Sequence, residues 1–147
     1  MKATELQIGD WVQIVEPCKY AGAIGRIKTL LDHKDDENAY FKVFLQNNTI
    51  HIGIDDICSE DIRPIPLTAE ILEKNGFENI GDDTYQLEEK PCWFWVDFFR
   101  HTYGCEYDTS TYEYEDDERR LKLYGIPSVH ELQHALRLCG IEKEIEL

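Results

Sequence analysis

The chain has 147 residues, with 15 basic and 30 acidic side chains and a formal net charge of -15 at pH 7. This length is enough for one domain with a substantial core or for two small ones. Because an anionic surface repels phosphate backbones, the charge argues against general DNA or RNA binding. It leaves docking onto a basic protein, mimicry of nucleic acid, or solubility alone.

The sequence lacks the features of membrane and secreted proteins. No apolar run is long enough to span a bilayer, and the N-terminal MKATELQIGD has no apolar signal-peptide core. We therefore expect a cytoplasmic protein without membrane contact. The cysteines are odd in number, widely spread and without a C-x-x-C pair, which predicts reduced, buried thiols at Cys18, Cys58, Cys92, Cys105 and Cys139.

Residues 1–66 are typical of short strands separated by turns. Gly22 and Gly25 bracket one turn, and Asn47-Asn48 forms another. Runs rich in β-branched and aromatic residues predict strands at 11–15, 26–30, 40–45 and 49–54. Such closely spaced strands indicate a small β-barrel. The segment Pro64–Pro66 is a rigid, extended exit, and it is the best candidate for a domain boundary.

This region resembles the SH3-like barrels of the KOW type. The resemblance is carried by Gly9-Asp10-x-Val12, by Gly22-x-x-Gly25-x-Ile27 and by the exit from Asp61 to Ile65, and it covers about residues 5–66. It implies an N-terminal SH3-like β-barrel. Such barrels occur in transcription and translation factors, where some bind RNA or polymerase and many bind proteins, so the resemblance implies a fold more than a function.

After Pro66 the pattern changes to helices around a second sheet. Thr68 as N-cap and Gly76 at the C-terminal end predict a helix at about 68–75. Strands are predicted at 84–87, 92–99 and 105–115, and a last helix begins at Ser128 and stops at Gly140-Ile141. The predicted class is α+β: an SH3-like β-barrel in residues 1–66, then a small antiparallel sheet with two helices in residues 67–147.

The last predicted helix contains the zinc-hydrolase motif H-E-x-x-H as His130-Glu131-Leu132-Gln133-His134. Helical spacing would put His130 and His134 on one face, where they could bind zinc, with Glu131 as the base. The helical wheel places both histidines opposite the apolar side that includes Val129, which predicts that they face solvent. Glu131 is explained by a capping box with Ser128. No third ligand follows at the usual spacing, so we expect no metal and keep a zinc-dependent hydrolase as an alternative.

The aromatic run in the middle of the second region allows two interpretations. On a strand, Trp93, Trp95 and Phe99 share one face. They belong either to a strand that is buried on both sides or to a stacking platform for a planar ligand such as a nucleobase. Cations that could hold a phosphate follow at Arg100, His101, Arg119, Arg120 and Lys122.

A second candidate surface is the tyrosine-rich stretch that follows. Its tyrosine rings alternate with carboxylates, a composition that suits a protein interface as well as an ordinary exposed hairpin. The tyrosines are Tyr107, Tyr112 and Tyr114.

The sequence contains no nucleophile elbow, phosphate-binding glycine loop or dinucleotide fingerprint, so we expect no enzyme activity and no cofactor.

The chain as a whole also resembles short uncharacterised proteins encoded by phages and mobile elements of gut bacteria. The matching residues are Pro64 to Thr68, Gly76-Phe77 and Val129 to Gln133, which spells VHELQ. The resemblance implies an origin but no established activity. We expect a non-enzymatic binding protein that engages a host protein or a defence component. The alternatives are a protein that sequesters a nucleotide signal, the zinc hydrolase, and a DNA mimic.

Overall fold

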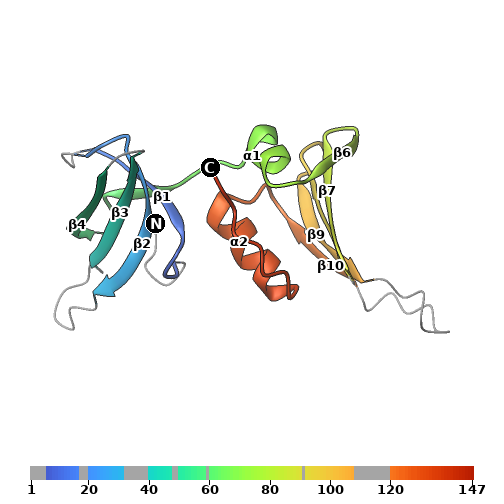
Figure 1. Ribbon diagram of the computed structural model, residues 1–147. Coiled ribbons are helices and arrows are strands. Elements are labelled where there is room, and N and C mark those ends of the chain that lie inside the picture. The colour runs from blue at the N-terminus through green and yellow to red at the C-terminus, as the bar shows by residue number, and fades with distance from the viewer. Residues whose placement is uncertain are drawn as a thin grey trace. The chain divides into compact units, whose positions relative to one another are not determined.

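A computed structural model describes residues 6–16, 20–31, 40–47, 50–58, 60–90, 92–107 and 120–147. The chain divides into two compact units, residues 1–65 (unit 1) and 66–147 (unit 2) (Figure 1). The division falls within the predicted exit at Pro64–Pro66. That residues 1–66 and 67–147 fold as separate domains remains a prediction.

Unit 1 is an antiparallel sheet of five strands in the order β4-β3-β2-β1-β5. The strands are β1 Trp11–Ile14, β2 Ile24–Leu31, β3 Tyr40–Asn47, β4 Ile50–Cys58 and β5 Ile62–Pro64. Four of them lie where the sequence predicts strands. Alternation places Val12 and Ile14 of β1 on one face of the sheet, where both are fully buried, as is Ile27 of β2. Trp11, on the other face of β1, is buried as well.

The sheet of unit 1 is not closed into a barrel. Its edge strands are β4 and β5, and they do not pair with each other in the described part of the chain. Strand β5 has three residues and pairs with β1 alone, so it extends the sheet by one short edge. The structure therefore shows a sheet-rich unit, and the SH3-like barrel is not confirmed.

Unit 2 is a second antiparallel sheet of five strands with two helices. The strands follow one another as a meander in the order β10-β9-β8-β7-β6. They are β6 Glu78–Gly81, β7 Thr84–Glu89, β8 Cys92–Asp97, β9 Thr102–Tyr107 and β10 Arg120–Tyr124. The helices are α1 Ala69–Lys74 and α2 Val129–Leu138, and both lie on the same side of the sheet (Figure 1). The predicted antiparallel sheet with two helices is confirmed.

Helix α1 begins and ends as its sequence predicts. The Thr68 side chain accepts a hydrogen bond from the Ile71 N–H, at 3.4 Å. Gly76 adopts a φ of 80°, which allows the Phe77 N–H to donate to the Leu72 carbonyl at 3.0 Å. The Phe77 ring then meets the Phe94 ring edge to face, with centroids 6.5 Å apart. The helix stop therefore also anchors α1 on the sheet.

Helix α2 is defined by the predicted caps. The Ser128 N–H donates to the Glu131 carboxylate at 2.7 Å, within a capping box. At the other end, Gly140 has a φ of 74°, and the Ile141 N–H donates to the Leu136 carbonyl at 2.9 Å. Val129, Leu132 and Leu136 are fully buried, so the predicted apolar side of the helix does face the core.

The histidines of α2 do not both face solvent, and that prediction was wrong. His130 is only 4% exposed, and its Nδ1 lies 2.8 Å from the Ser128 hydroxyl. Ser128 also bridges to Pro66, which brings the chain that enters α1 beside the first turn of α2. A helical wheel cannot include this long-range neighbour. His134 is half-buried, with its ring centroid 5.7 Å from that of His130.

The capping box makes the stability of unit 2 depend on pH. Burial raises the pKa of Glu131, but hydrogen bonds from the Ser128 backbone and hydroxyl, with nearby His130 and His134, lower it more, to below its ordinary value of 4.5. A carboxylate whose pKa is lowered on folding contributes stability above the unfolded pKa, and this is lost as the pH falls through the folded pKa. We expect Glu131→Gln to be less stable than the native chain at pH 7, and the difference to become smaller as the pH falls below 4.5. Urea unfolding over this pH range measures it; a difference that does not change with pH would contradict the account.

Two buried amides hold the segment that follows α2. The Gln133 side chain donates to the Lys143 carbonyl at 2.5 Å and accepts from the Ile145 N–H at 2.6 Å. The Asn75 side chain does the same with Glu146, donating to its carbonyl and accepting from its N–H, each at 2.8 Å. Ile145 is thereby fully buried.

Neither described helix is long and apolar enough to cross a membrane.

Candidate functional site

The two faces of the second sheet differ in what covers them. Along β8, Cys92, Phe94 and Val96 are buried on the side of the helices, whereas Trp93 and Trp95 are half-buried on the other side. We call this other side the open face, because no described helix or strand of unit 2 covers it (Figure 1). A central strand thus presents two large aromatic side chains on a face without a covering layer.

The open face is hollowed into a groove of about 370 Å³ around these tryptophans. All five strands contribute to its lining, with Ile80, Thr84, Gln86, Trp93, Trp95, Asp97, Thr102, Glu106 and Lys122, and Arg100 adds to it from the turn after β8. The register explains the hollow: Gln86, Trp95, Gly104 and Lys122 stand opposite one another on successive strands. Gly104 has no side chain to fill the space between Trp95 and Lys122.

Gly104 also permits the close approach of β9 and β10. A Cβ atom at this position would collide with the backbone carbonyl of Leu121 on the neighbouring strand. A side chain here would force the two strands apart. The depression in the open face is therefore built into the backbone of the sheet.

The two described cations of the groove already have partners on the sheet. The Arg100 guanidinium lies 3.2 Å from the Asp97 carboxylate, which also accepts the Arg100 N–H at 2.7 Å. The Lys122 ammonium lies 5.6 Å from the centroid of the Tyr124 ring. Asp97 is buried, so the Arg100 ion pair also neutralises a carboxylate that would otherwise be buried without a counter-charge.

Trp93 stands between two carboxylates. It is opposite Glu88 on β7 and opposite Glu106 on β9. Directly opposite residues on one face have Cβ atoms about 4.5–5.5 Å apart, so both carboxyl groups can reach the edges of the indole ring. The immediate surroundings of Trp93 are thus acidic, while the positive side chains lie elsewhere in the groove.

The structure brings four of the predicted ligand-binding residues together: Trp93, Trp95, Arg100 and Lys122 all line the groove. That they bind a ligand remains a prediction. Phe99 was wrongly placed on the face of the tryptophans. Strand β8 ends at Asp97, whose carboxylate accepts the Arg100 N–H and turns the chain, and this leaves the Phe99 ring 76% exposed outside the strand.

Other predicted site residues have side chains that lie either outside the described part of the structure or on the helix side of the sheet. Arg120 begins β10 opposite Glu106, but its side chain lies outside the described part of the structure, as do Arg119, Tyr112 and Tyr114 entirely. Tyr107 lies on the helix side of the sheet, where its hydroxyl donates to the Cys139 carbonyl at 3.3 Å. This hydrogen bond gives Tyr107 a structural role, and its place in an interface stays a prediction.

Several lining residues were not predicted from the sequence, among them Thr84, Gln86, Thr102 and Glu106. Their alternation is visible in the sequence, but their neighbours depend on strand register. One signal could have found Gln86 and Glu88: only two residues separate Glu89 from Cys92, and such a short connection fixes the hairpin register.

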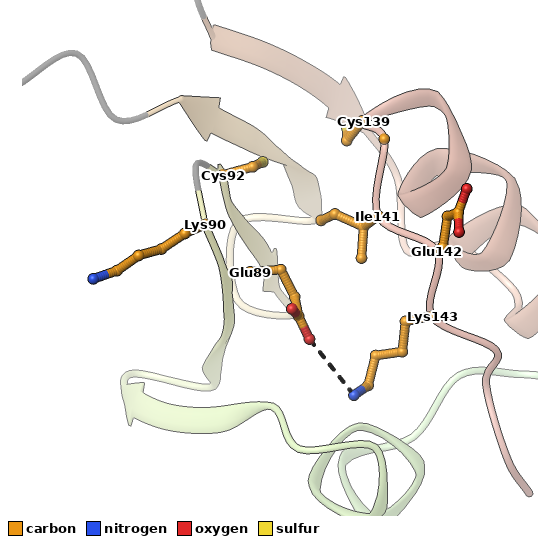
Figure 2. Close-up of a pocket in the computed structure, with 8 residues that line it drawn as sticks. Glu89, Lys90, Cys92, Cys139, Ile141, Glu142 and Lys143 are labelled. Carbon is orange, nitrogen blue, oxygen red and sulfur yellow. Dashed lines mark ion pairs between the residues drawn. The ribbon is translucent and has the colours of Figure 1, made fainter. Parts of the chain in front are cut away.

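A second hollow of about 390 Å³ lies between the β7–β8 end of the sheet and the segment after α2 (Figure 2). Cys92 and Cys139 line it, together with the ion pair between Lys143 and Glu89, whose charged atoms are 3.9 Å apart. The Cys139 thiol donates to the Cys105 sulfur at 2.7 Å. All three thiols are free and buried, as predicted.

The Cys92 and Cys139 thiols are poor nucleophiles in the folded protein. Burial, and next the neighbouring Cys105 thiol, raise the pKa of Cys92 to about 12, and the pKa of Cys139 is raised by burial and by Cys105 as well. Because the thiolate is the reactive form, Cys92 carries roughly a thousandfold less of it at neutral pH than an ordinary cysteine. We expect iodoacetamide to modify Cys92 and Cys139 slowly in the native chain and completely in urea, as read by peptide mass spectrometry. Equal rates in both states would contradict this assignment.

The zinc motif has the predicted spacing but an incomplete set of ligands. In the described part of the chain no group of three or more histidine, cysteine or carboxylate side chains is arranged to hold a metal ion. Glu131, the base that the motif would require, is held by Ser128 in the capping box. The arrangement therefore gives no support to the zinc-hydrolase alternative.

Comparison of the chain with protein-family models, with curated proteins and with solved structures finds no match.

Proposed function

We propose that the chain is a non-enzymatic binding protein that engages a partner protein through the open face of unit 2. One observation carries the proposal: Trp93 and Trp95 line a groove of about 370 Å³ on a sheet face that the described part of unit 2 leaves uncovered. Tryptophan and arginine dominate the energetics of protein interfaces, where they sit in pockets near the centre. Half-buried polar side chains such as Gln86 and Thr84 lie near the tryptophans in the lining and can hydrogen-bond to a partner backbone.

The biological setting belongs to the same proposal. From the resemblance to phage and mobile-element proteins, we propose that the partner is a host protein or a defence component in the bacterial cytoplasm. The SH3-like barrel in residues 1–66 is part of the proposal as well. It is supported by the five antiparallel strands of unit 1 and by the turns at Ile8-Gly9 and at residues 20–22.

A nucleotide-sequestering protein is the second candidate. It is favoured by the convergence of two tryptophans with Arg100 and Lys122 in one groove. Two contacts argue against nucleotide binding: Arg100 is paired with Asp97, and Lys122 lies over Tyr124, so both cations already have interactions that a phosphate would have to replace. The groove also contains Glu106, and a carboxylate repels an anionic ligand. The protein partner is therefore the function that the site supports better.

Affinity capture with matched variants tests the proposal. The tagged native chain, the double variant Trp93→Ala/Trp95→Ala and the control Phe99→Ala are each incubated with a bacterial extract, and recovered proteins are quantified by mass spectrometry. Phe99 is a suitable control because it is exposed and outside the groove. We expect a partner that is recovered by the native chain and by Phe99→Ala and is lost with the double variant. Recovery of the same proteins by all three chains, or of none, would contradict the proposal.

A further inference from the structure

Trp93 lies at the centre of a row of side chains that runs across the open face. The row contains Glu88 on β7, Trp93 on β8 and Glu106 on β9, each directly opposite the next. On β10 the backbone of Arg120 pairs with that of Glu106. Trp93 thus has a carboxylate-bearing residue directly opposite it on each neighbouring strand, Glu88 beside the groove and Glu106 in its lining.

We infer that the partner's anchor is a cationic side chain, an arginine or a lysine, that stacks on Trp93 between Glu88 and Glu106. The inference rests on the proposed function and names the chemistry of its partner. The face of an indole ring is negative, and it attracts a cation that lies within about 6 Å of its centroid. The flanking carboxylates supply charge-assisted hydrogen bonds to the same cation.

The rest of the groove agrees with a cationic anchor. The guanidinium of Arg100 lies against Asp97 and the ammonium of Lys122 lies over Tyr124, so the two cations described in the groove already interact within unit 2. Lys90 lies 3.9 Å from Glu88, but both side chains are largely exposed, and such pairs are easily exchanged for a better partner.

Two further features of the chain support a positively charged partner. Residues 67–147 carry 8 basic and 19 acidic side chains, a net charge of -11, which attracts a basic partner over a distance. In unit 1 the guanidinium carbon of Arg26 lies 4.4 Å from the ring centroid of Trp11, its cross-strand neighbour. The same chain thus contains one arginine stacked on a tryptophan of a sheet.

A defined probe tests the inference: a hexaarginine peptide, titrated calorimetrically at about 0.15 M salt, where long-range attraction is screened. We expect Trp93→Ala to weaken its binding roughly tenfold or more. Trp93→Phe keeps an aromatic face and should weaken it less, which separates loss of the ring from loss of the fold. Glu88→Gln/Glu106→Gln should weaken binding about fivefold or more. The control Glu73→Gln/Glu142→Gln changes the net charge equally at exposed sites elsewhere and should weaken it less than about twofold.

Equal weakening by the two glutamate pairs, or binding that does not depend on Trp93, would overturn the inference, because either result means attraction by net charge alone. Titrations with hexaglutamate and with adenosine triphosphate complete the test. If one of these anions binds in a Trp93-dependent manner and hexaarginine does not, the cationic anchor is wrong and the groove remains a binding site. Failure of the proposed function would look different: captured proteins would be the same with and without the groove tryptophans.

Discussion

Replacing Phe94 with alanine is expected to lower the free energy of unfolding by about 3–5 kcal/mol, the largest effect of any single change considered for unit 2. Phe94 is fully buried in the central strand of the sheet. Its ring meets that of Phe77, so the substitution empties the contact that anchors α1 on the sheet. The remaining cavity cannot collapse easily, because β8 is paired on both sides. Urea unfolding followed by circular dichroism measures the loss.

The matched control is Phe99→Ala, which removes the same side chain five residues along the chain. Phe99 is largely exposed in the turn after β8, so its loss should change the free energy of unfolding by less than about 0.5 kcal/mol. Similar losses for the two variants would mean that the strand continues past Asp97 and that the faces of β8 are wrongly assigned.

The second large effect is expected at Asn75, which joins α1 to the segment after α2. Its amide donates to the carbonyls of Ile71 and Glu146, at 2.7 and 2.8 Å, and its oxygen accepts the Glu146 N–H. Asn75→Ala leaves these backbone groups without their partner at a mostly buried position. We expect a loss of about 2–3 kcal/mol. Hydrogen exchange of the Ile145 and Glu146 amides should accelerate at the same time, because the segment loses an anchor.

Asn79→Ala is the control for this prediction. Asn79 lies on an exposed strand and makes a single local hydrogen bond, from the Gly81 N–H to its side-chain oxygen. Its loss should amount to less than about 1 kcal/mol and should leave exchange at Ile145 and Glu146 unchanged. If Asn75→Ala behaves like Asn79→Ala, the last residues are held by apolar contacts alone.

Local signals in the sequence predicted local structure well. Thr68 and Gly76 mark the start and the end of α1, and the capping box of Ser128 with Glu131 marks the start of α2; each acts on backbone groups a few residues away. Period-two alternation correctly placed Trp93 and Trp95 on a common face. These predictions held because hydrogen bonds to neighbouring residues decide them.

Long-range structure was predicted less well. The wheel of α2 correctly buried Leu132 but wrongly left His130 in solvent, because a wheel contains only the helix itself and none of the residues that pack against it. Phe99 was misassigned because the Asp97 carboxylate ends the strand two residues earlier. The groove depends on the register of five strands, on a glycine at position 104 and on the side that the helices cover. The sequence of a single strand does not show which residues lie beside it on the neighbouring strands, so it cannot predict the groove.

The most direct test of the central claim is to observe the indole N–H groups while the partner binds. The chain has three tryptophans, and their side-chain resonances can be assigned in a ¹⁵N-labelled protein by single Trp→Phe variants. Trp11 is buried in unit 1 and serves as an internal reference. When a captured partner is added, we expect the Trp93 and Trp95 resonances to shift or broaden and that of Trp11 to stay in place. A partner that binds without changing either Trp93 or Trp95 would show that the open face is not the binding surface.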